Sequence, residues 1–255
     1  MPLNILCCVK RVPMTGGRIV LTADEQAIET RHLGFTISPH EECGVEEAVR
    51  LIEANGGSST VLALGPPEAE EQLRDCMALG IDRAIHLLAD DEFDGQATAR
   101  AIVEAIEAER AAGTEYDVVF FGNESADAGG FQVGIRVAHA LGRPCVTGVK
   151  AVALEDGGLR LEQEVPGGRD VYRVPLPAVV TVKEGLNLPR YPSVPGRMRA
   201  KRKPLDTRPV AAAGAGVEKV RWVVPDDQGK QAQILGHGPD AAPAVVEILR
   251  VAGVL

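Results

Sequence analysis

Short apolar runs that alternate with longer amphipathic stretches occupy the first two-thirds of the chain. The apolar runs have the length of buried strands and lie at residues 5–9, 60–64, 84–88 and 118–121. The amphipathic stretches carry apolar residues at helical spacing and lie at residues 46–54, 68–79, 97–112 and 130–141. This alternation builds a mostly parallel sheet with helices on both faces, and ligands then bind at the carboxyl ends of the strands. The sequence therefore predicts a Rossmann-like α/β fold.

The pattern changes after residue 146. Glycine-containing turns separate three further strands and predict an appended antiparallel meander over residues 149–174, followed by a buried strand at 178–182. Residues 187–196 contain three prolines, so we expect neither regular helix nor central strand there. Residues 204–217 have the composition of a linker, and a short strand at 220–224 and a helix at 241–251 follow. We expect a nucleotide-binding domain over residues 1–203, which includes the meander and a recognition loop at 187–198, and a C-terminal arm over residues 204–255.

Length and charge narrow the function classes. A chain of 255 residues is long enough for one sizeable core, and its net charge of −9 argues against a general nucleic-acid binder, because phosphates would repel it. No run reaches the roughly 18 apolar residues that span a bilayer, and the first residues lack the basic region of a signal peptide. Five cysteines without a C-x-x-C pair indicate reduced thiols. We therefore expect a cytoplasmic protein that does not insert into membranes.

Residues 118–141 form the segment with the clearest chemical pattern. A buried strand ends at Gly122, a polar loop follows, and a helix is expected to open near Gly130. Small residues at such a turn leave backbone N–H groups free to bind a phosphate, and the helix dipole adds positive potential. Ser125 and Gln132 could add hydrogen bonds. A glycine-rich turn that serves only helix packing fits the pattern equally well at this point.

Catalytic patterns are absent from the sequence. The loop has neither a Walker A motif nor G-x-G-x-x-G, and Asp127 has no histidine or cysteine near it in sequence. The five histidines show no metal-ligand spacing. A nucleotide-binding fold without catalytic groups indicates a carrier or a binding module.

Five motifs occur in order over about residues 3–205: VKRVP at 9–13, SPHEE at 38–42 with VEEAVRL at 45–51, LGIDRA at 79–84, GNESAD at 122–127 with QVG at 132–134, and LNLPRYPSVP at 186–195 with MRAKRK at 198–203. Together they resemble the motifs of electron-transfer flavoprotein beta subunits. The resemblance implies a heterodimer with a larger alpha subunit whose FAD carries electrons from acyl-CoA or related dehydrogenases to a quinone oxidoreductase. The beta subunit would form a wall beside that FAD and hold its own nucleotide. It would be an electron-carrier subunit, not an enzyme.

That second nucleotide is AMP in the ordinary branch of the family and a second FAD in the electron-bifurcating branch. By position in the motifs, the nucleotide contacts fall on Cys8, Ser38, Pro39, His40, Glu41, Leu64, Ser125, Ala126, Asp127, Ala128, Gly129, Gly130, Phe131, Gln132, Val133 and Gly134. Bifurcating members usually carry Asp-Thr where Gly129-Gly130 stand, so the resemblance favours AMP, with FAD as the alternative. Ser38 stands where the family has Asn, and His40 stands where it has an aromatic residue or Asp. That side of the site is therefore altered.

The proline-rich segment has a physical logic of its own, since prolines stiffen an exposed loop and lower the entropy lost on docking. The resemblance places the partner contacts at Tyr191, Val194, Pro195, Met198, Arg199 and Arg202. Leu188 stands where the family has an acidic residue, and this replacement predicts a more apolar loop surface. The basic run after the loop suits an acidic partner, although a solvated turn would carry the same charges. A stand-alone nucleotide-binding module stays as a third alternative, and the motifs outside the nucleotide loop disfavour it.

Overall fold

A computed structural model describes residues 2–14, 16, 19–89, 93–211, 216–217, 219–225 and 233–255. The chain forms two compact units. The larger unit comprises Met1–Val20 and Ile28–Val220, and the smaller unit comprises Leu21–Ala27 and Arg221–Leu255. The sheet, the helices that cover it and the predicted nucleotide residues all belong to the larger unit.

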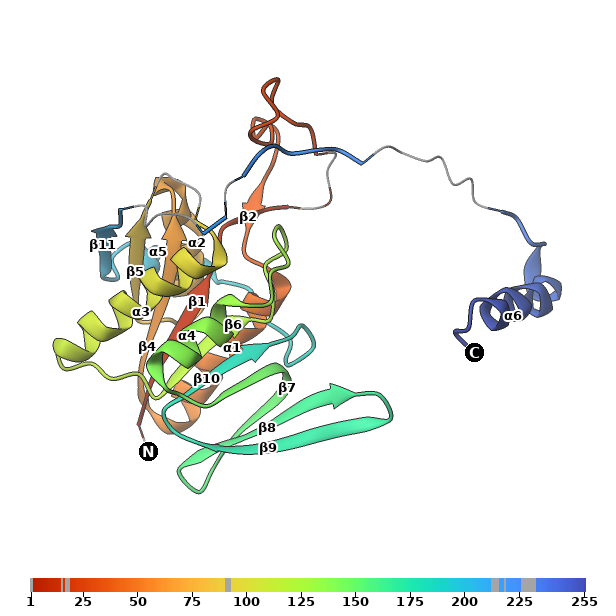
Figure 1. Ribbon diagram of the computed structural model, residues 1–255. Helices are drawn as coiled ribbons and strands as arrows, with labels where there is room; N and C mark the ends of the chain where they lie inside the picture. Colours follow the sequence, from red (N-terminus) through yellow and green to blue (C-terminus); the bar gives the residue numbers. More distant parts are fainter. Residues whose placement is uncertain are drawn as a thin grey trace. The chain divides into compact units, whose positions relative to one another are not determined.

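A nine-stranded sheet forms the centre of the larger unit (Figure 1), with the strand order β11-β5-β4-β1-β6-β10-β7-β8-β9 among the described residues. Its strands are β1 (Leu3–Val9), β4 (Gly57–Gly65), β5 (Arg83–Leu88), β6 (Val118–Gly122), β7 (Cys145–Glu155), β8 (Gly158–Val165), β9 (Gly168–Pro175), β10 (Ala178–Val182) and β11 (Leu205–Pro209). The pairs from β11 to β7 are parallel, and β8 and β9 are added antiparallel. A separate antiparallel ladder joins β2 (Val12–Pro13) and β3 (Phe35–Thr36).

Helices cover both faces of the sheet because successive strand residues point in opposite directions. On one face, Leu3, Ile5 and Cys7 of β1 belong to a core with α1 (Pro39–Asn55) and α2 (Glu70–Leu79). On the other face, Leu6 and Cys8 belong to a second core with α3 (Gly95–Ala111) and α4 (Val133–Leu141). The 3-10 turn Pro67–Ala69 leads into α2, and α5 (Val194–Ala200) packs near α2. The predicted α/β fold with its antiparallel meander is confirmed.

The strand order fixes where a ligand can bind. After β1 the chain crosses through α1 to β4, whereas after β6 it crosses through α4 toward β7 on the opposite side. Since β1 and β6 are neighbours, their carboxyl ends flank the point where the crossovers diverge. Ligands of open α/β sheets bind in the crevice at such a switch point.

Several boundaries differ from the sequence prediction. Helix α4 begins at Val133 and not at Gly130, and α5 begins at Val194 inside the predicted loop, with Pro195 in its first turn. Proline is tolerated there because first-turn N–H groups have no partner within the helix.

The segment 204–217 was expected to be a linker, but it contains β11. Leu205 to Pro209 pair with β5, and the described parts of the linker are 204–211 and 216–217. The expected strand at 220–224 is wrong: these residues form no strand, although their apolar side chains suggested one.

The smaller unit holds the C-terminal helix α6 (Ala242–Val251), preceded by the 3-10 turn Gly238–Ala241. Helix α6 agrees with the predicted helix at 241–251. Its apolar residues, including Val245, Ile248 and Val251, are exposed within the chain. Among the helices of the described residues, none combines the length and the apolar character that a membrane crossing requires.

Candidate functional site

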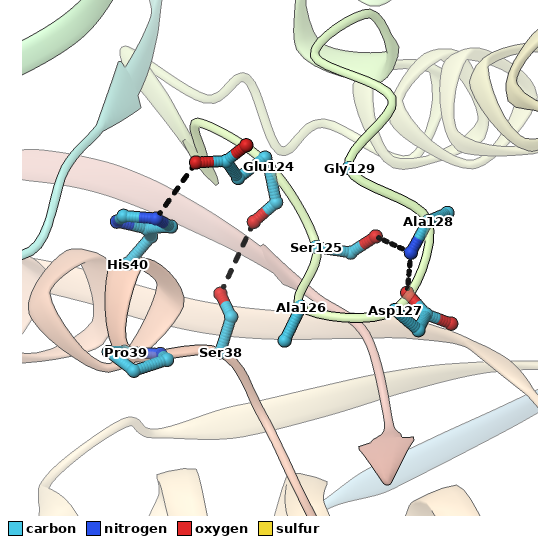
Figure 2. A pocket seen from close by; sticks show the side chains of 9 residues that line it. All are labelled: Ser38, Pro39, His40, Glu124, Ser125, Ala126, Asp127, Ala128 and Gly129. Atoms are coloured by element: carbon cyan, nitrogen blue, oxygen red, sulfur yellow. Dashed lines mark hydrogen bonds and ion pairs between the residues drawn. The ribbon is translucent and has the colours of Figure 1, made fainter. Parts of the chain in front are cut away.

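A pocket of about 330 Å³ lies at the switch point (Figure 2). One wall comes from the start of α1 and the other from the loop after β6. The lining residues are Ser38, Pro39, His40, Glu124, Ser125, Ala126, Asp127, Ala128 and Gly129. We call residues 38–41 the helix wall and residues 124–129 the loop wall.

The helix wall is fixed by a complete capping box. The Ser38 hydroxyl accepts a hydrogen bond from the N–H of Glu41 at 3.2 Å, and the Glu41 carboxylate accepts one from the N–H of Ser38 at 2.8 Å. Pro39 occupies the first turn, where its fixed φ suits a helix. The combination Ser-Pro-x-Glu therefore sets the start of α1 from local sequence alone.

Glu41 is buried behind this wall and also accepts the N–H of Lys10 at 3.0 Å. Burial raises the pKa of Glu41 to about 8, and the hydrogen bonds from Ser38 and Lys10 offset part of the rise. A Cβ on Gly122 would lie 2.7 Å from Cγ of Glu41, so the end of β6 must be glycine for the carboxylate to fit. Glu41 thus ties the end of β1 to the start of α1.

The loop wall is held more loosely. Ala128 donates its N–H to Asp127 Oδ1 at 2.7 Å and to Ser125 Oγ at 3.4 Å. Gly129 and Phe131 both adopt positive φ, 54° and 53°, and Phe131 is exposed. A positive φ is uncommon for a residue with a side chain, so the loop reverses direction sharply before α4.

Two contacts join the walls. The Ser38 hydroxyl lies 3.4 Å from the Glu124 carbonyl oxygen, and Nε2 of His40 lies 3.3 Å from Oε1 of Glu124 (Figure 2). A third contact bridges the strand ends, because Lys10 Nζ lies 2.6 Å from Oδ2 of Asp127. Burial would raise the pKa of Asp127, but the hydrogen bond and charge of Lys10 hold it below its ordinary value.

The start of α4 offers free backbone donors. Its N-cap Gln132 makes no side-chain cap, since the Gln132 amide oxygen accepts a bond from Arg136 Nε at 2.8 Å. Gly134 has a packing role, because a Cβ there would lie 2.8 Å from Thr181 Cγ2. Gly130 has no such constraint: its Cβ would meet Gln132 at no less than 3.6 Å. Of the two readings that the sequence left open for this turn, close packing therefore applies to Gly134 and not to Gly130.

The structure brings together part of the predicted nucleotide set. Ser38, Pro39 and His40 face residues 125–129 across the pocket. Cys8, Glu41, Leu64 and residues 130–134 lie near the strand ends but do not line the pocket. Cys8 is buried in the core under α3 and α4, and Leu64 and Val133 pack against that core. The predicted site residues did not include Glu124 and Lys10, although both lie within the quoted motifs GNESAD and VKRVP.

The residues present suit a nucleotide. The uncapped N–H groups of α4 and the loop amides are donors for a phosphate, while the Glu124 carboxylate and Ser38 hydroxyl can bond the hydroxyls of a ribose. The volume is at the lower end of the range of about 300–1,000 Å³ for small-molecule sites. Among the described residues no group of three side chains could hold a metal ion. Together these donors and acceptors can bind a nucleotide.

The predicted recognition loop lies outside this pocket and presents apolar side chains to solvent. Leu188, Tyr191 and Val194 are 91%, 95% and 77% exposed, and Met198 is also exposed. Pro195 lies in the first turn of α5. Arg199 and Arg202 are exposed and form no ion pair within the described part of the chain.

The loop is nevertheless fixed to α1. Arg190 donates hydrogen bonds to the Glu46 carboxylate from Nε and Nη2, at 2.9 and 3.0 Å, and to the Glu53 carboxylate from Nη1, at 2.7 Å. Such bidentate bonds fix orientation as well as position. Asn187 donates to the Cys43 carbonyl at 3.0 Å and to Glu47 Oε2 at 2.9 Å. Four exposed apolar residues are thus displayed on a clamped segment.

Part of the basic run serves the fold. Lys203 Nζ donates to the carbonyl oxygens of Met77 and Ile81 at 3.0 and 2.6 Å, at the end of α2. Burial lowers the pKa of Lys203. The charges left for a partner are those of Arg199, Lys201 and Arg202.

Comparisons with known proteins agree with this geometry. Residues 27–213 match the family model of the electron transfer flavoprotein domain. A Bacillus subtilis protein named "Electron transfer flavoprotein subunit beta" is 33% identical over 80% of this chain and 78% of its own length. Proteins of the same name from Syntrophomonas wolfei and Bradyrhizobium diazoefficiens are 36% and 30% identical, over 88% and 99% of this chain and 87% and 100% of their own lengths. The chain belongs to the electron transfer flavoprotein family, among its beta subunits.

Proposed function

We propose that this chain is the beta subunit of a heterodimeric electron-transfer flavoprotein and holds one AMP in the switch-point pocket. The observation that carries the choice of AMP is the size of the pocket, about 330 Å³, which suits a mononucleotide better than a dinucleotide. The phosphate would lie at the Gly129 end of the pocket, beyond which the backbone N–H groups at the start of α4 could reach it, and Ser38, His40 and Glu124 would face the rest of the nucleotide. The role of this AMP is structural: it joins the helix wall to the loop wall.

Electron transfer in the heterodimer is assigned to an FAD held mainly by an alpha subunit. This chain would cover one side of that flavin, and the C-terminal segment 204–255 would contact the alpha subunit. The exposed apolar side of α6 supports that contact, since an isolated chain gains nothing from exposing Val245, Ile248 and Val251. The electron donors would be acyl-CoA or related dehydrogenases, and the electron acceptor would be a quinone oxidoreductase. The protein would be located in the cytoplasm.

The clamped segment 187–198 is proposed as the docking loop for the dehydrogenase. Because Arg190 and Asn187 already order it, little conformational entropy is lost when a partner binds. Leu188, Tyr191 and Val194 offer apolar anchors, and the unpaired Arg199 and Arg202 suit an acidic rim on the partner.

The nucleotide assignment is tested by the content of the purified heterodimer. Protein is denatured, flavin is measured by absorbance and AMP is measured by chromatography. One FAD and one AMP per heterodimer is the expected result. Two FAD and no AMP would overturn it and place this protein in the bifurcating branch.

The docking assignment is tested with Val194→Ala. We expect an intact, FAD-loaded heterodimer whose reduction by the dehydrogenase is slowed at limiting partner concentration, because an apolar anchor has been shortened. Val171→Ala is the matched control, since Val171 is 45% exposed and lies on β9, outside both the loop and the C-terminal segment. Charge reversal at Arg199 and Arg202 should act on the association rate, with a strong dependence on salt. Loss of the heterodimer in Val194→Ala, or a titration identical to wild type, would refute the assignment.

A further inference from the structure

His40 contacts both the pocket and the turn that precedes the docking loop. Its Nδ1 accepts the N–H of Glu184 at 2.7 Å, and its Nε2 lies 3.3 Å from Oε1 of Glu124 in the pocket. A neutral imidazole has one donor and one acceptor nitrogen. Since Nδ1 accepts, Nε2 carries the proton and donates to Glu124. One ring therefore joins the loop wall to the segment that follows β10.

That segment leads directly into the docking loop. Lys183 N–H bonds to the Val149 carbonyl at 2.9 Å, and a tight turn follows in which Gly185 has φ of 91° and Leu186 N–H bonds back to Lys183. Asn187, the first clamped residue of the loop, lies three positions after Glu184. The His40–Glu184 bond is thus the contact by which the pocket reaches this turn.

Helix α1 carries both ends of the connection. Its first turn presents His40 to the pocket, as Figure 2 shows for the ring and Glu124. Glu46, Glu47 and Glu53, further along the same helix, hold Arg190 and Asn187. The docking loop therefore rests on a helix whose start is a wall of the nucleotide site.

We propose that His40 is a positioning residue through which nucleotide occupancy orders the turn at Glu184 that leads into the docking loop. The inference rests on the proposed nucleotide site. A nucleotide in the pocket packs against His40 and Glu124 and restricts the imidazole, which keeps Nδ1 aimed at the Glu184 N–H. Without it, the partly exposed ring can turn toward water and release that N–H. By linkage, ordering of the loop then strengthens nucleotide binding by the same factor.

Two substitutions separate the two bonds of the ring. In His40→Asn the side-chain oxygen can replace Nδ1 as acceptor for Glu184, and the reach to Glu124 is lost. In His40→Gln the longer amide can still donate to Glu124, and the acceptor near Glu184 is lost. Both variants keep a polar side chain of moderate size at a half-buried position, so a change in only one of them cannot come from general loss of packing.

The experiment is amide hydrogen exchange over residues 184–191 in the heterodimer, with AMP, with FAD and without nucleotide. In wild type, nucleotide should slow exchange at Glu184 by at least about fivefold, the lower end of typical coupling between sites. His40→Asn keeps an acceptor for Glu184 but not the link to Glu124, so its exchange at Glu184 should be slower than in His40→Gln and the same with and without nucleotide. His40→Gln should bind nucleotide, but nucleotide should no longer change exchange at Glu184.

The outcomes distinguish the two proposals. If FAD alone binds and slows exchange, the AMP assignment fails and the coupling stands. If AMP binds but exchange at Glu184 does not change, or His40→Gln responds as wild type does, the coupling is overturned and the AMP site stands. If neither nucleotide binds, both proposals fall.

Discussion

The two walls of the pocket are built in opposite ways. The helix wall, residues 38–41, is buried or half-buried apart from Pro39 and has its backbone groups satisfied by a capping box and by Glu41. The loop wall, residues 124–129, is more exposed. It is held by bonds from the Ala128 N–H within the loop and by Lys10 at Asp127, and it is followed by positive φ at Phe131 and an uncapped α4.

This difference separates stability from binding. The helix wall completes its hydrogen bonds within the protein, so it is organised before a ligand arrives. The loop wall and the first turn of α4 leave N–H groups that a phosphate can complete. Changes in the helix wall should therefore lower the free energy of unfolding, whereas changes in the loop wall should act on nucleotide retention.

Glu41 should give the largest effect, through pH. Its pKa in the folded protein is about 8, above the ordinary 4.5. The native state therefore holds this proton up to a higher pH than the unfolded chain does. Its contribution to the free energy of unfolding is fully present below the ordinary pKa and is lost as pH rises through the folded pKa, at no more than about 1.4 kcal/mol per pH unit.

The measurement is urea unfolding from pH 4.5 to pH 8, with Glu41→Gln, which cannot titrate, as the comparison. We expect wild type to lose stability relative to the variant as pH rises. Parallel profiles would show that Glu41 is ionised in the native protein throughout this range.

Gly122→Ala should lower the free energy of unfolding by about 1–3 kcal/mol, the usual cost of overpacking. The new methyl group would lie 2.7 Å from Glu41 Cγ and 3.3 Å from Ser38 Oγ, and both side chains are held by the capping box. Gly65→Ala is the control, because it also ends a parallel strand and its Cβ would come no closer than 3.6 Å to Ala69. Equal denaturation midpoints for the two variants would count against a rigid helix wall.

Ser38→Ala should cost about 1 kcal/mol, the typical value for a lost N-cap. It removes the acceptor for the Glu41 N–H and the contact with the Glu124 carbonyl. Thermal unfolding measures the loss. Ser125→Ala should have a smaller effect, since its hydroxyl accepts a long 3.4 Å bond from Ala128 and otherwise bonds to Asp127 of the same exposed loop. A larger effect at Ser125 would reverse the ranking of the walls.

Gly130→Val should change the free energy of unfolding least, within about 0.5 kcal/mol. The sequence suggested strain or close packing at this glycine, but Gly130 has ordinary φ and open space apart from Gln132. The expected effect is on AMP, because a branched side chain would stand beside the donors of α4. Calorimetric titration of the nucleotide-free heterodimer with AMP, alongside thermal unfolding, checks both halves. A marked fall in melting temperature would show that the loop wall is packed after all.

The sequence by itself determined most of the elements of the larger unit, the two faces of the sheet and the family. Side chains along β1 point alternately to the two faces of the sheet, which places Ile5 and Leu6 in different cores. Ser38, Pro39 and Glu41 set the start of α1 through contacts between near neighbours in the chain. Patterns of this kind are local, so they can be read in order. The same is true of the motif residues, whose order carried the resemblance over most of the chain.

Only the tertiary structure decided which of these elements meet. The polar segment 205–209 is a strand because β5 offers it an edge. Lys10 reaches Asp127 and Arg190 reaches Glu46 across more than a hundred residues. No local pattern encodes such pairs, since they depend on where the crossovers bring distant segments together. For the same reason the sequence could not separate Gly130, which has room, from Gly122, whose missing side chain makes space for Glu41.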